Sequence, residues 1–125
     1  MRPELDNIRA LVDGGSYEDA LACCIIVWKT YLASRQHRGL GLLCVYTSSS
    51  ARNVKDTSSL ESLIDDAFPL AAGGDPFQAM LVIRLYSEGL VDKARFNSIV
   101  WEKSPGLLSD ERVRRWFDLA RELRG

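Results

Sequence analysis

The sequence predicts an all-α protein, an α-solenoid of stacked antiparallel helix hairpins with about seven helices. Apolar residues recur at helical spacing in most segments between turns. Glycines, prolines and capping residues divide the chain into pieces of helix length. The apolar stripes are too wide for a lone hairpin, so successive hairpins must cover one another and leave a groove.

Composition is typical of a soluble globular chain with one domain, residues 1–125. Hydrophobic residues make up 46% and charged residues 26%, which argues against disorder. The net charge of −1 gives no broad attraction for phosphate, so we expect no nucleic-acid partner. The longest apolar run, residues 20–28, is too short to span a bilayer. Three cysteines inside apolar runs, with no signal-peptide pattern, predict a reducing compartment and a cytoplasmic protein.

The first two helices have clear start and stop signals. Pro3 suits the first position of a helix that Gly14 and Gly15 end. Residues 16–19 resemble a capping box, which opens a second helix running to about Arg35. Because its apolar residues cover almost the whole circumference, we expect this helix to be buried from several sides.

Residues 40–46 are ambiguous, since their β-branched and aromatic content also fits a strand. We interpret them as helix because the better-marked neighbours are helical. Residues 58–61 form a second capping-box pattern, and Pro69 is expected to end the helix that follows, together with Gly73 and Gly74.

The last third of the sequence predicts three more helices. Asp75 and Pro76 supply an N-cap and a first-turn proline for a helix that Gly89 closes. A further helix is expected to carry the apolar residues from Val91 to Trp101. Residues 109 and 110 then cap a final amphipathic helix. The tryptophans at 28 and 101 are interpreted as core.

An internal repeat is predicted by placing Gly15 over Gly89. The two segments then align without a gap, and residues 25–26 fall over residues 99–100. The offset of about 74 residues is two steps of a period in the mid-thirties, which a helix–turn–helix repeat requires.

The turn before the second helix resembles a motif of tetratricopeptide-like repeats. The motif here is Gly15-Ser16-Tyr17-Glu18-Asp19-Ala20-Leu21, and residues 89–94 repeat it with Val91 in place of the aromatic residue. In that family the glycine ends a helix, the aromatic residue wedges between helices, and the alanine lets two backbones approach. The family's tryptophan and proline markers are not matched, so the resemblance implies a divergent member.

A narrower set of residues is similar to the cytosolic helical domain of tail-anchored docking peroxins. The residues, in order, are 17–23 with Trp28, 43–45, and 85–87 with Trp101. This similarity implies an adaptor in peroxisomal protein transport that docks an AAA-ATPase complex at the cytosolic face of the organelle. The sequence ends at Gly125 without the membrane anchor of that family, so the similarity implies a soluble fragment or a shortened relative.

No pattern predicts a catalytic residue, a cofactor or a metal site. His37 is the sole histidine and is interpreted as a solvated turn residue. One histidine without C-x-x-C spacing leaves a zinc site short of ligands. Asp65 and Asp66 are neighbours on one helix and point apart, which suits a solvated face.

We therefore expect a non-enzymatic adaptor or scaffold that holds a helix or peptide of a protein partner in its groove. The final helix places a basic cluster beside a tryptophan, and these residue types dominate binding hot spots. A salt-bridged solvent face is the alternative, with Glu111 near Arg115 and Asp118 near Arg121. The predicted binding residues are Arg112, Arg115 and Trp116 on the final helix, and Asn7, Arg9, Gln78 and Arg84 on the first helices of hairpins.

Three other interpretations stay open. The chain could be an oligomerising structural subunit, with Trp116 and Phe117 packed against a second copy, so monomer and homo-oligomer are both retained. It could be an RNA-binding helical repeat, against which the near-neutral charge argues. It could be an α/β enzyme with residues 42–46 as a strand, which a helix content under about 50% would favour.

Overall fold

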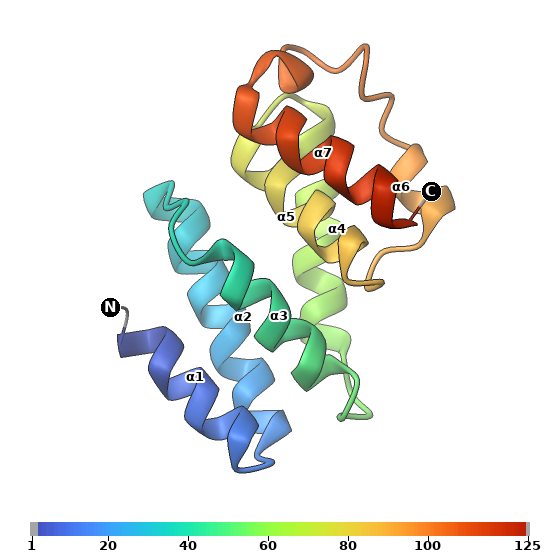
Figure 1. The fold of residues 1–125 in the computed structure, drawn as a ribbon. Coiled ribbons are helices and arrows are strands. Elements are labelled where there is room, and N and C mark those ends of the chain that lie inside the picture. The colour runs from blue at the N-terminus through green and yellow to red at the C-terminus, as the bar shows by residue number, and fades with distance from the viewer. Residues whose placement is uncertain (1–2, 125) are drawn as a thin grey trace. The chain divides into compact units, whose positions relative to one another are not determined.

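The computed structural model describes residues 3–124 and is all-helical (Figure 1). Helices, with the 3₁₀ turn included, account for 74% of residues 3–124, and no strand occurs in this range. The all-α prediction is therefore confirmed. Residues 40–46 lie in helix α3 (Leu40–Ala51), so the α/β alternative is wrong.

The chain divides into two compact units, Met1–Leu63 and Ile64–Gly125, which we name the N-terminal and C-terminal units. The division falls within helix α4 (Ser58–Ala72). The folding of residues 1–125 as one domain and the stacking of hairpins into a solenoid stay predictions.

The N-terminal unit is built on α1 (Pro3–Asp13), α2 (Tyr17–Ser34) and α3, and each of these helices packs against the other two (Figure 1). Ile8, Trp28 and Leu43 are fully buried at their centre. The indole Nε1 of Trp28 donates to the hydroxyl of Thr47 at 3.0 Å, which satisfies a polar group that α2 buries. The core role predicted for Trp28 is confirmed.

Ser16 does not form the predicted capping box, because the end of α1 already engages its backbone. Its N–H donates to the carbonyl of Leu11 at 2.8 Å, and the Gly15 N–H donates to Val12 at 3.1 Å. These two bonds, with Gly15 at φ 77°, form a Schellman turn. Ser16 is left at φ −85° and ψ 61°, and its side chain makes no capping hydrogen bond.

The second predicted capping box is also wrong. Helix α4 begins at Ser58, ahead of the apolar Leu60, and its cap comes from outside the pattern. A carboxylate oxygen of Asp56 accepts from the Ser58 N–H at 3.0 Å and from the Ser58 hydroxyl at 2.6 Å. A carboxylate at this place also suits the positive end of the helix dipole.

Helix α4 continues through Pro69 to Ala72, so the predicted end at Pro69 is wrong. Proline removes one hydrogen bond and crowds the preceding turn, at a cost of about 3 kcal/mol. The apolar stripe continues past it, however, because Ala67 and Ala71 are both fully buried. The carbonyl of Pro69 still accepts from the Gly73 N–H at 3.0 Å.

The rest of the C-terminal unit comprises α5 (Pro76–Ser87), α6 (Lys93–Asn97), the 3₁₀ turn η1 (Leu107–Ser109) and α7 (Glu111–Arg124). The caps predicted at Asp75 and Asp110 are confirmed, since each carboxylate accepts two backbone N–H bonds. Helices α5 and α7 pack side by side (Figure 1). Gly74, at φ 104°, permits the connection to α7 to pass close by, because a Cβ there would lie 2.9 Å from the Pro105 carbonyl oxygen.

The helix predicted across residues 91–101 is wrong beyond α6, which has only five residues. The indole Nε1 of Trp101 donates to the carbonyl of Phe96, five residues earlier, at 3.2 Å. Phe96 itself stacks on Tyr86, with ring centroids 4.0 Å apart, and lies 4.9 Å from Trp101 and 6.0 Å from Phe117. The chain after α6 therefore buries these four rings instead of continuing as a helix. The predicted structural match of residues 25–26 with residues 99–100 is wrong, because only residues 25–26 are helical.

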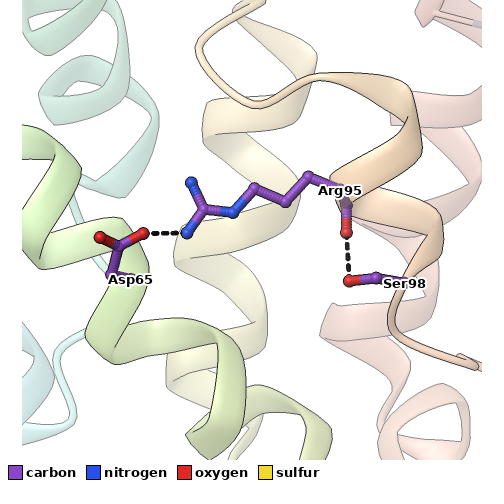
Figure 2. Close-up of polar contacts among 3 residues, drawn as sticks. All are labelled: Asp65, Arg95 and Ser98. Atoms are coloured by element: carbon purple, nitrogen blue, oxygen red, sulfur yellow. Dashed lines mark hydrogen bonds and ion pairs between the residues drawn. The ribbon is translucent and has the colours of Figure 1, made fainter.

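Arg95 of α6 forms a tertiary contact with α4 within the C-terminal unit. The guanidinium of Arg95 pairs with the carboxylate of Asp65, and the Arg95 carbonyl accepts from the Ser98 hydroxyl at the end of α6 (Figure 2). The guanidinium carbon also lies 4.5 Å from the ring centroid of Phe68. Asp65, expected only on a solvated face, is thus a tertiary partner while still 62% exposed.

Candidate protein-binding surface

Helix α7 carries two apolar stripes, of which only one is buried. Val113, Phe117 and Ala120 face the core of the C-terminal unit. The second stripe follows at 116, 119 and 123, a spacing that places these residues along one side of a helix. Trp116 is half-buried, whereas Leu119 is 37% and Leu123 is 64% exposed. The final helix therefore presents apolar side chains to solvent beside those it buries.

The structure brings together two binding residues that the sequence predicted separately. Arg84 leaves α5 so that its guanidinium carbon lies 3.3 Å from the ring centroid of Trp116 on α7. A cation over an indole face gains about 0.5–2 kcal/mol, depending on how far it is desolvated. Both side chains are half-buried, so the stacked pair is held in place and still meets solvent.

Two further predicted residues lie at the N-terminal end of this stripe. Arg112 and Arg115 are exposed and form no ion pair with any residue in the range 3–124. The salt-bridge pattern expected on α7 is wrong, because Asp118 pairs with Arg114 at 3.3 Å rather than with Arg121. The guanidinium groups of Arg112 and Arg115 are thus available to a partner. We name this set the α7 surface; its members are Arg84, Arg112, Arg115, Trp116, Leu119 and Leu123.

The remaining predicted binding residues lie elsewhere. Gln78 is half-buried on α5, in the same unit as Arg84. Asn7 and Arg9 are exposed on α1 in the N-terminal unit, where Arg9 lies 3.7 Å from the carboxylate of Asp13. A surface shared by residues of both units stays a prediction.

Sequence reasoning missed apolar exposure in the N-terminal unit. Helix α2 was expected to be buried from several sides, yet Ile26 is 64% exposed, and Leu42 and Val45 are exposed on α3. The signal was present in the composition, since both helices are apolar around most of their circumference while only some of that surface has a partner.

Among the titratable groups of the described residues, the Cys24 thiol has a strongly shifted pKa. Burial raises the pKa of the Cys24 thiol to about 11, outweighing the hydrogen bond with Thr47, so this thiol stays protonated at neutral pH. Residues 3–124 contain no group of three or more acidic, cysteine or histidine side chains placed to hold a metal ion. Nor does any helix in this range have the length and apolar character needed to cross a bilayer.

Comparisons with models of protein families, with curated proteins and with solved structures found no match to this chain. Function has to be inferred from the surface itself.

Proposed function

We propose that this protein is a non-enzymatic interaction module that binds a protein partner through the α7 surface. The observation that carries the proposal is the stacking of Arg84 on Trp116 beside exposed Leu119 and Leu123. Tryptophan and arginine are the residues most enriched at binding hot spots. An apolar stripe on a helix is also the usual surface against which a second helix packs.

Pre-organisation supports this proposal. A binding side chain that is mobile in the free protein loses conformational freedom when a partner arrives, at about 0.5–1.5 kcal/mol for each residue. The guanidinium of Arg84 and the indole of Trp116 already restrict one another. Their arrangement lowers that cost at the N-terminal end of the stripe.

The charges on α7 indicate the chemistry of the partner. Five arginines and three acidic residues lie on this helix, and Arg112 and Arg115 lie beside the apolar stripe. A partner segment that carries carboxylates next to aliphatic side chains would match both features. We therefore expect an acidic amphipathic helix rather than an uncharged peptide.

The test is affinity capture followed by measurement of a dissociation constant. Proteins captured from lysate by the wild-type chain are identified, and the partner segment is synthesised. The double variant R115A/W116A should weaken its binding roughly 30-fold or more, since loss of a hot spot costs at least about 2 kcal/mol. The matched control E102A/K103A alters two exposed residues outside the α7 surface and should leave the affinity unchanged.

Either of two results would contradict the proposal. If R115A/W116A and the wild type captured the same proteins equally, the α7 surface would not be the binding surface. Sedimentation showing a homodimer that R115A/W116A dissociates would assign the same residues to an oligomer interface instead.

A further inference from the structure

A groove in the N-terminal unit lies between α2 and the segment that leads into α4. Its volume is about 310 Å³, at the lower end of the range for ligand pockets. A second hollow of about 340 Å³ adjoins it at the start of α2 and shares Glu18 with it. Glu18 therefore lies at the border between the two hollows.

The floor of the groove is apolar. Leu21, Ala22 and Ile25 contribute from α2, and Val54 contributes from the connection between α3 and α4. Ile26, one helical turn beyond Ala22, is 64% exposed and extends the apolar surface along α2. A ligand that only carried charge would leave this floor in contact with water.

The rim of the groove is acidic. Glu18 lies in the first turn of α2 and Asp56 lies before α4, and no lysine or arginine is among the described residues that line the groove. Asp19 adds a third carboxylate in the adjoining hollow. Hydrogen bonds from the Ser58 hydroxyl and backbone N–H hold the pKa of Asp56 below its usual value, so this carboxylate is ionised at neutral pH.

We infer that this groove binds a peptide segment of a second protein in which a lysine or arginine adjoins one or two aliphatic side chains. The aliphatic groups cover Leu21, Ile25 and Val54, while the cation meets Glu18 and Asp56. The volume accommodates one or two anchoring side chains, and the adjoining hollow continues the path of an extended backbone. This site has the opposite charge to the α7 surface, so it binds a different kind of segment and does not depend on the function proposed above.

The probe for the test is a random dodecapeptide library displayed on phage and selected against the full chain. Peptides that survive should carry lysine or arginine within three positions of leucine, isoleucine or methionine. Their affinities, measured by fluorescence anisotropy with synthetic peptides, should fall about tenfold in the double variant E18Q/D56N, because each exposed charge pair contributes up to about fivefold. Asparagine at position 56 keeps a side-chain oxygen for the cap of α4, so the fold is retained.

A second variant tests the floor independently of the charge. Ala22 is exposed on α2, so Ala22→Trp can fill the groove without entering the core, and it should abolish binding of the same peptides. The matched control is R115A/W116A, which alters the other surface and should leave these affinities unchanged.

Four outcomes would overturn the inference. One is a selection that yields no enriched peptide, and another is enrichment of peptides without a basic residue. The third is a set of basic peptides whose affinity is the same for the wild type, E18Q/D56N and Ala22→Trp. Concentration-dependent association that Ala22→Trp removes would assign the groove to a second copy of this chain and would equally overturn it.

Discussion

The two units of this protein are similar in length and both all-helical, yet their cores differ in kind. In the N-terminal unit, three long helices supply a core of mostly aliphatic residues around Trp28 and Tyr31. In the C-terminal unit, four aromatic rings meet, and two of them come from a five-residue helix and the turn after it. The N-terminal core is formed by continuous helices. In the C-terminal core, the segment after α6 packs aromatic rings and is not helical.

This difference shows that helical hydrogen bonding and the packing of distant side chains favour different conformations of the same backbone segment. In a regular helix the carbonyl of Phe96 would accept from the N–H four residues later. Here the indole of Trp101 donates to that carbonyl, and the chain beyond Asn97 leaves the helix. Aromatic pairs contribute about 0.5–1.5 kcal/mol each beyond their buried area, which is enough to outweigh one lost helical turn.

The largest effect expected from a single substitution is at Phe96, which contacts Tyr86, Trp101 and Phe117. Phe96→Ala should lower the free energy of unfolding of the C-terminal unit by about 3–5 kcal/mol, measured by urea denaturation. Amide hydrogen exchange should show loss of protection in α5 and α7 with protection retained in α2 and α3. Val100→Ala, at a residue 53% exposed, is the control and should change stability by less than about 0.5 kcal/mol. Equal loss of protection in both units would show that they unfold together.

A smaller effect is expected at the polar contact inside the other core. Trp28→Phe removes the Nε1 donor to Thr47 and part of a fully buried ring, and should cost about 1–3 kcal/mol. Protection of the amides from hydrogen exchange should now decrease in α2 and α3 and stay unchanged in α7. Trp101→Phe, which removes the bond to the Phe96 carbonyl, should give the reverse pattern. The same pattern from both variants would mean that the two cores are not separate.

The elements that the sequence predicted correctly are those with local signals. Asp75 followed by Pro76 starts α5, and Gly14 with Gly15 ends α1, because caps and stops act within a few residues. The end of α4 and the extent of α6 were missed because burial of Ala71 and of Phe96 decided them, and both depend on distant contacts. Ser16 failed as a cap since the turn that ends α1 leaves it at ψ 61°, outside the extended backbone conformation of a capping residue.

The candidate site shows the same limit. Trp116 and Arg84 could each be picked from the sequence by residue type and by helix, since both types are common at interfaces. Their stacking depends on the packing of α5 against α7, which no spacing within either helix encodes. The acidic groove of the N-terminal unit was missed because its walls come from α2 and from a connection about 30 residues later, a separation that sequence periodicity does not register.

The smallest effect concerns what holds α6 in the C-terminal unit. Asp65 pairs with Arg95 at the surface, with side chains 62% and 33% exposed (Figure 2). Asp65→Asn should therefore cost no more than about 1 kcal/mol, and less at high salt, in urea denaturation at two ionic strengths. Asp66→Asn is the matched control, because its exposed carboxylate is the next in the chain. If Asp65→Asn destabilised the unit as much as Phe96→Ala, the ion pair rather than the aromatic cluster would fix α6, and the contrast between the two cores would lose its cause.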